Sequence, residues 1–196
     1  MRQIEQDILH RALAGDDEAY AQVVDVYQTP VYNLCYRMLG ETGEAEDAAQ
    51  DTFWRAYQAL NRYDRQRPFG TWLLSIAAHF CIDQQRKRRL PTYELDEVTE
   101  ETFPDPTPNP EKAVGQLEQD RLLHQLLASM NKLDCAVLVL RYWNDFSEEE
   151  ISQALSLTVS AVKSRLHRAR LLLAQRWQAA QPQTALERNH YGSPAF

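Results

Sequence analysis

Apolar residues recur every three or four positions along most of the chain, and no stretch alternates β-branched and polar residues between turns. This spacing places apolar side chains on one face of a helix. The sequence therefore predicts an all-α protein. Pro30 and Gly40 are the clearest breaks in the pattern. We expect helices near residues 4–14, 17–28, 30–39, 44–60 and 70–88 in the first half, and near 112–130, 134–143, 147–155 and 159–178 in the second.

A segment of different composition, residues 91–111, separates the two halves. It holds five prolines, seven acidic residues and no Lys or Arg. Such a segment has too little apolar surface to order itself by burial. We interpret it as a flexible acidic linker between two small helical domains, residues 1–90 and 112–180. The tail, residues 181–196, loses the helical spacing and is expected to be disordered.

The net charge of -7 is distributed unevenly along the chain. Residues 1–90 carry -2, the linker carries -7, and residues 112–196 carry +2. Residues 62–89 hold seven basic and two acidic residues, and residues 159–176 hold five basic residues and no acid. Two basic regions therefore flank an acidic linker, and an overall negative charge does not exclude nucleic acid as a partner.

The composition limits the classes of protein to which the chain can belong. With 44% hydrophobic and 25% charged residues, the chain is typical of a globular protein. No apolar run approaches the roughly 20 residues that span a bilayer. The polar N-terminus shows no secretory signal, so we expect a cytoplasmic protein.

The three cysteines, Cys35, Cys81 and Cys135, are widely spaced and lie in apolar stretches. We expect them to be reduced core residues rather than disulfide or metal partners. The sequence also lacks a Ser/His/Asp set, a Gly-rich phosphate loop and a zinc-spaced cluster. We therefore expect no enzyme activity, no metal and no cofactor.

The second half has the helix start and stop signals of a helix-turn-helix. Ser147 and Glu150 form a capping-box pattern at the start of a short helix, and Thr158 caps a longer basic helix after a turn. Apolar residues share one face of that longer helix: Val162, Leu166, Ala169 and Leu173. Donors suited to phosphates and base edges share the opposite face: Ser160, Lys163, Ser164, His167 and Arg168. A solvated cationic face on a helical hairpin is the alternative interpretation.

Two sequence blocks resemble a known family. Residues 47–60 (DAAQDTFWRAYQAL) with residues 69–79 (FGTWLLSIAAH) are similar to region 2 of extracytoplasmic-function sigma factors. Residues 147–173, which include VKSRLHRAR at 162–170, are similar to region 4 of the same family. The resemblance implies a sigma factor that binds core RNA polymerase and directs promoter-specific initiation. It also implies an anti-sigma factor as a partner.

The resemblance assigns roles to individual residues. A helix face that docks on the clamp coiled coil of the largest polymerase subunit would include Asp47, Gln50, Asp51 and Phe53. A pocket for an unstacked base of the minus-10 promoter element, with cations for the strand, would include Arg62, Tyr63, Arg65, Arg67, Phe69 and His79. Contacts to the minus-35 element would come from Ser160, Lys163, Ser164, Arg165, His167 and Arg168. Many relatives have Asn where this chain has His79.

Several alternatives stay open at this point. Trp72 and Ile76 lie one helical turn apart, which is more typical of core packing than of a base platform. The basic cluster of residues 86–89 suits either DNA phosphates or a favourable helix C-terminus. A stand-alone helix-turn-helix regulator that never enters polymerase is the alternative function, and retention by core polymerase separates the two.

Overall fold

The computed structural model describes the backbone of residues 4–88 and 110–180, with the side chains of residues 4–87 and 119–180. All regular structure in these ranges is helical, as predicted. The predicted linker and tail lie outside the described residues, so the predicted domain boundaries stay predictions. The first half holds α1 (Gln6–Leu13), α2 (Asp17–Leu39), α3 (Thr42–Ala59), the short 3₁₀ helix η1 (Leu60–Arg62) and α4 (Phe69–Arg88). The second holds α5 (Pro110–Ala128), α6 (Lys132–Tyr142), α7 (Glu148–Ala154) and α8 (Val159–Ala180).

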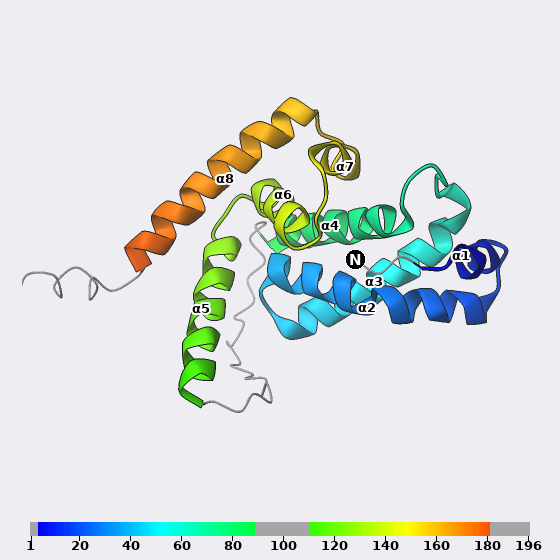
Figure 1. Ribbon diagram of the computed structural model, residues 1–196, viewed down its shortest axis with the longest axis horizontal. Coiled ribbons are helices and arrows are strands. Elements are labelled where there is room, and N and C mark those ends of the chain that lie inside the picture. The colour runs from blue at the N-terminus through cyan, green and yellow to red at the C-terminus, as the bar shows by residue number, and fades with distance from the viewer. Residues whose placement is uncertain (1–3, 89–109, 181–196) are drawn as a thin grey trace, which may run out of the picture.

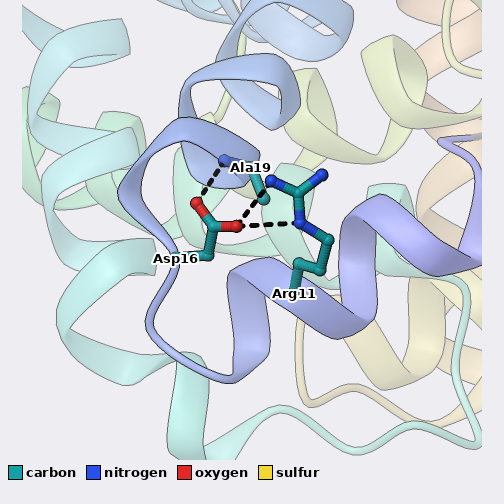
Figure 2. A network of polar contacts seen from close by, with 3 residues as sticks. All are labelled: Arg11, Asp16 and Ala19. Carbon is teal, nitrogen blue, oxygen red and sulfur yellow. Dashed lines mark hydrogen bonds and ion pairs between the residues drawn. The ribbon is translucent and has the colours of Figure 1, made fainter.

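Helix α2 organises the first half, because α1, α3 and α4 all pack against it (Figure 1). Its N-terminus is fixed by Asp16, whose carboxylate accepts a hydrogen bond from the backbone N–H of Ala19 at 3.1 Å. The other carboxylate oxygen of Asp16 contacts Arg11 of α1 at 2.6 Å (Figure 2). These bonds lower the pKa of Asp16, the backbone bond to Ala19 contributing most. One carboxylate therefore caps α2 and fixes the turn from α1.

The predicted break at Pro30 is wrong, since α2 runs through it without interruption. Proline lacks the backbone donor of a helix interior, which costs about 3 kcal/mol in an isolated helix. The buried side chains of α2 keep one register across this position, from Val23 and Tyr27 to Val31 and Leu34. Packing of this continuous face against α3 and α4 outweighs the local cost. The break at Gly40 is confirmed, because Gly40 ends α2 in a left-handed conformation with φ 83°.

The second half forms the predicted helix-turn-helix from α7 and α8. Ser147 and Glu150 make both bonds of the capping box, and Thr158 Oγ1 accepts from the backbone N–H of Ala161 at 3.1 Å. The buried stripe of α8 is also confirmed, with Val162, Leu166 and Ala169 buried and Leu173 partly buried against the core. Leu171 is exposed.

The two halves pack against each other through α6. In Figure 1, α6 lies between α8 and the group formed by α2 and α4, and it packs against all three. The buried residues of both halves form one continuous apolar cluster. The predicted two helical domains therefore meet in a shared core.

The cysteines are free and buried, as predicted. Burial raises the pKa of the Cys135 thiol to about 12, and a neighbouring Cys35 thiol together with burial raises the pKa of Cys81. The Cys81 and Cys135 thiols therefore stay protonated at neutral pH.

Because Pro30 leaves one helical hydrogen bond unmade, we expect Pro30→Ala to stabilise the protein by about 1–2 kcal/mol. Urea unfolding followed by circular dichroism measures the change. Gln28→Ala, at an exposed position of the same helix, is the control and should change the free energy of unfolding by less than about 0.5 kcal/mol. A destabilised Pro30→Ala variant would show that the proline ring is itself a packing element.

Candidate nucleic-acid and polymerase interfaces

Helix α8 presents its predicted donor face to solvent. The side chains of Ser160, Lys163, Ser164, His167 and Arg168 are all exposed on the face opposite the buried stripe. The first turn of α8 contains no acidic residue. Lys163 contacts Glu148 of α7 at 3.4 Å, but its side chain is 62% exposed, so the contact is weak and exchangeable. This face has the residue types and access that a major groove requires.

Arg165 differs from the other predicted minus-35 residues. Its guanidinium donates to Asp134 of α6 at 2.7 Å, and only 24% and 18% of the two side chains are exposed. The sequence pattern could not reveal this, because Asp134 lies 31 positions away. Arg165 is thus engaged inside the domain, where it links α8 to α6.

The loop between η1 and α4 brings together four of the six predicted minus-10 residues. Tyr63, Arg65, Arg67 and Phe69 line one cavity of about 430 Å³. Arg65 and Arg67 are exposed at its rim, and Arg67 contacts Asp64 at 3.7 Å. The cavity therefore combines aromatic walls with exposed cations, the combination that a single strand needs.

Aromatic packing holds this loop. Tyr63 lies 5.2 Å from both Phe69 and Trp72 by ring centroids, and its hydroxyl donates to the carbonyl of Arg67. Burial raises the pKa of Tyr63, so the hydroxyl remains a donor at neutral pH. Phe69 itself is buried against Tyr27, at 5.6 Å, and forms the floor of the cavity. Trp72 and Ile76 are partly buried against the core, as predicted.

Arg62 and His79 are exposed but do not line the cavity. His79 follows Phe69 by ten residues on α4, which is about 15 Å along the helix. Its Nδ1 lies 2.8 Å from the carbonyl of Ser75. The structure therefore separates His79 from the aromatic pocket.

One face of α3 carries the predicted polymerase contacts. Asp47, Gln50 and Asp51 are exposed and line a cleft of about 430 Å³ between α3 and α4. Phe53 turns instead toward the core, where it is partly buried. Sequence reasoning missed Trp54, which is 60% exposed and follows Asp47, Gln50 and Asp51 at helical spacing. Large exposed aromatic side chains are enriched at protein interfaces.

The described part of the basic cluster is exposed. Arg86 and Lys87 face solvent at the end of α4, and Arg86 contacts Asp83 at 3.7 Å with 81% of its side chain exposed. Residues 88 and 89 of the cluster lie outside the described side chains. No helix within residues 4–88 or 110–180 is long and apolar enough to cross a membrane. The described residues also hold no cluster of three or more His, Cys, Asp or Glu side chains suited to a metal ion.

Both halves of the chain are similar to known proteins. The Sigma-70 region 2 model matches residues 23–90, and the Sigma-70 region 4 model matches residues 120–173. The chain is 39% identical over 164 residues to the ECF RNA polymerase sigma factor SigW of Bacillus subtilis, covering 80% of this chain and 87% of that protein. It is 30% identical over 173 residues to the RNA polymerase sigma-H factor of Pseudomonas aeruginosa, covering 85% and 90%.

Two solved structures share the fold. CnrH, solved in complex with the cytosolic domain of CnrY, superposes with a TM-score of 0.67 at 25% identity, covering 89% of this chain and 97% of that chain. The sigma factor RpoE of Bartonella quintana, solved with the anti-sigma factor NepR, gives a TM-score of 0.64 at 17% identity, covering 83% and 98%.

We expect Arg165→Ala to destabilise the protein by about 1–3 kcal/mol, because it leaves the half-buried Asp134 carboxylate without its partner. Thermal or urea unfolding measures this loss. Lys163→Ala, which removes the exposed pair with Glu148, is the matched control and should cost less than about 0.5 kcal/mol. Equal stability of the two variants would contradict the structural role of Arg165.

Proposed function

The chain belongs to the extracytoplasmic-function sigma factors of the sigma-70 family, and we propose that it binds core RNA polymerase through α3 and promoter DNA through two separate surfaces. It is a transcription initiation factor rather than a catalyst. The single observation that supports this assignment of surfaces is the presence of exposed residues of suitable chemistry in both matched regions. Such a protein works with its polymerase in the cytoplasm.

The polymerase contact is proposed for the exposed face of α3. Asp47, Gln50 and Asp51 offer carboxylates and an amide to a basic partner helix, such as the clamp coiled coil of the largest subunit. Trp54 adds apolar area at the end of the same face. Phe53 is proposed to support this face from inside, because it is partly buried.

The minus-10 contact is proposed for the loop and the start of α4. A flipped base would enter the cavity lined by Tyr63 and Phe69, while Arg62, Arg65 and Arg67 would hold the strand through its phosphates. His79 would reach a neighbouring nucleotide farther along α4. Unstacking a base costs a few kcal/mol, which the aromatic walls offset by stacking.

The minus-35 contact is proposed for α8 in the major groove. Arg168, His167 and Lys163 supply charge and base-edge donors, with Ser160 and Ser164 as short hydroxyl donors. Arg165 is proposed to position this helix through Asp134. Because each domain is held on the same polymerase, neither needs high affinity alone.

A protein inhibitor is also proposed. CnrH, which shares this fold, was solved with the cytosolic domain of CnrY. We propose an anti-sigma factor that covers the polymerase or DNA surfaces of this chain. Co-purification of the tagged chain from its native host, followed by mass spectrometry, is the measurement, and recovery of polymerase alone under all growth conditions would count against this partner.

Run-off transcription tests the function as a whole. Core polymerase with this chain should initiate at a defined set of genomic promoters, whereas core polymerase alone should not. If purified core polymerase fails to retain the chain, the stand-alone DNA-binding regulator becomes the better assignment.

We expect Asp51→Arg to weaken core polymerase binding about tenfold or more, because it places a cation against a basic partner helix. Co-elution or fluorescence anisotropy with core polymerase measures the affinity. Asp25→Arg makes the same charge change at an exposed position of α2 and should leave the affinity within about twofold. Equal losses in both variants would show that net charge, not the α3 face, governs binding.

We expect Arg168→Ala to weaken binding to matched promoters by about 1–3 kcal/mol, and initiation at these promoters should fall accordingly. The variant should also have a relaxed base preference at one minus-35 position. Transcription from a promoter library randomised in this element measures the effect. Ser164→Ala on the same face should act more weakly, because it removes a neutral donor. A uniform loss across matched and scrambled elements would assign Arg168 to phosphate binding instead.

A further inference from the structure

Three exposed ion pairs lie on the candidate DNA surfaces of the first half and of α8. The pairs are Asp64 with Arg67, Asp83 with Arg86, and Glu148 with Lys163, at 3.7, 3.7 and 3.4 Å between the charged atoms. Arg67 lies at the rim of the candidate minus-10 pocket, Lys163 on the donor face of α8, and Arg86 in the basic cluster at the end of α4. Each of these surfaces therefore carries a carboxylate beside one of its cations.

Glu148 reaches the donor face of α8 from a different helix. Residues 159–176 contain no acid, so this part of α8 has no negative charge of its own. Glu148 is the first residue of α7, where the capping box between Ser147 and Glu150 fixes the backbone. The Glu148 side chain is 32% exposed, against 62% for Lys163. The pair therefore results from the packing of α7 against α8, and not from spacing within one helix.

Asp64 and Asp83 each lie three residues before the arginine that they contact. Asp64 uses its two carboxylate oxygens differently: Oδ1 accepts from the backbone N–H of Gln66 at 2.9 Å, and Oδ2 contacts Arg67. One oxygen thus shapes the loop while the other holds the cation. On α4, Asp83 and Arg86 have 59% and 81% of their side chains exposed. Both arginines therefore remain open to solvent and to DNA.

These three pairs contribute little to the stability of the fold, because water screens exposed charges and holding two side chains in one geometry costs entropy. Other ion pairs of the described residues have structural roles. Arg11 and Asp16 fix the turn before α2. Arg165 and Asp134, with 24% and 18% of their side chains exposed, join α8 to α6. The three exposed acids are better explained by their position on the candidate DNA surfaces.

An acid beside a DNA-facing cation opposes DNA binding in two ways. The cation must exchange the carboxylate for a phosphate, and the carboxylate then lies close to the negative charge of the DNA backbone. Two unit charges about 4 Å apart in water change an equilibrium constant by about fivefold. Each phosphate that a cation neutralises also adds about 0.9 to the slope of log affinity against log salt concentration. Removing such an acid should therefore raise both the affinity and its salt dependence.

We propose that Asp64, Asp83 and Glu148 weaken the binding of this chain to DNA of any sequence, because each occupies the cation beside it and repels phosphates. The inference rests on the proposed function for the identity of the DNA surfaces. The acids act on the electrostatic part of DNA binding, which does not depend on base sequence. The base contacts proposed for α8 then make up a larger share of the total binding free energy.

Two variants with the same change in net charge test the proposal. The first combines Asp64→Asn, Asp83→Asn and Glu148→Gln, which removes the three carboxylates and keeps the size of the side chains. The amide oxygen at position 64 can still accept from Gln66. The second combines Glu18→Gln, Asp25→Asn and Asp120→Asn, at exposed positions outside the three pairs and outside the candidate sites. The comparison therefore separates local pairing from net charge.

Fluorescence anisotropy with a labelled duplex of about 25 base pairs measures binding by the free chain and by its complex with core polymerase. At about 100 mM salt, the first variant should bind about tenfold more tightly than the native chain. Its slope of log affinity against log salt concentration should be steeper by about two to three. The second variant should stay within about twofold of the native chain. Equal binding by the first variant and the native chain would overturn the proposal, as would equal tightening in the second variant.

A double-mutant cycle tests whether Glu148 acts through Lys163. Glu148→Gln should tighten duplex binding about two- to fivefold in the native chain, because it frees the ammonium group for a phosphate. In a chain with Lys163→Ala, the same change should have a smaller effect, of less than about twofold. Glu149→Gln, at an exposed position of the same helix, is the matched control and should leave the affinity within about twofold. Equal effects of Glu148→Gln in both backgrounds would overturn the role of the pair.

Matched and scrambled promoter duplexes provide a further readout. The first variant should bind both more tightly by the same factor, within about threefold, because phosphate contacts carry no sequence information. A larger difference between the two duplexes would overturn the sequence-independent role. Failure of core polymerase to retain the native chain would instead overturn the proposed function. The duplex affinities of the free chain would still decide the role of the three acids.

Discussion

The arrangement of this protein depends on the need to cover both sides of α6. Its consecutive buried residues, Cys135 to Leu140, cannot all be removed from water by one neighbouring helix. On one side, α8 provides the cover and is fixed there by Arg165 and Asp134. On the other side, α2 and α4 provide it. The two halves are therefore joined by hydrophobic burial at a helix that belongs to one of them, in addition to being joined along the chain.

This constraint connects the two candidate DNA surfaces. The recognition face of α8 points away from α6, so its donors stay exposed while the halves are packed together. The candidate minus-10 pocket lies at the contact itself, between the loop of the first half and the turn before α7. Packing of the halves therefore affects the two surfaces unequally. The donor face of α8 stays exposed, whereas the cavity of the first half is lined in part by residues of the second half.

The sequence predicted those features that depend on neighbouring residues. The capping box at Ser147, the cap at Thr158 and the buried stripe of α8 follow from local spacing and were confirmed. The prediction failed at Pro30 because it considered only the backbone hydrogen bond that proline cannot donate. Packing of α2 against distant helices stabilises the continuous helix by more than this missing bond costs. The family-based sets of site residues remain predictions; most of their members are exposed, whereas Phe69 is buried and Phe53 and Arg165 are partly buried.

Contacts between residues far apart in the sequence could not be predicted from the spacing of apolar residues. Arg165 pairs with Asp134, 31 positions away, and the hydrogen bond between Thr71 and Glu150 joins residues 79 positions apart. Periodicity says which face of a helix is apolar, but not which distant helix covers it. The apolar run of α6 did carry a usable signal. Residues 135–140 contain no polar side chain except a thiol, which in a helix indicates burial on more than one face.

Two terms of opposite sign act at the contact between α6 and the first half. Burial of Val139 and Leu140 stabilises the packed arrangement by roughly 1.5–3 kcal/mol for each side chain. Against this, Asn144 Oδ1 is buried beside the contact and has no hydrogen-bond partner among the described residues. An unsatisfied buried acceptor costs about 1–3 kcal/mol. The amide oxygen of Asn144 therefore offsets part of the stabilisation that apolar burial gives to this contact.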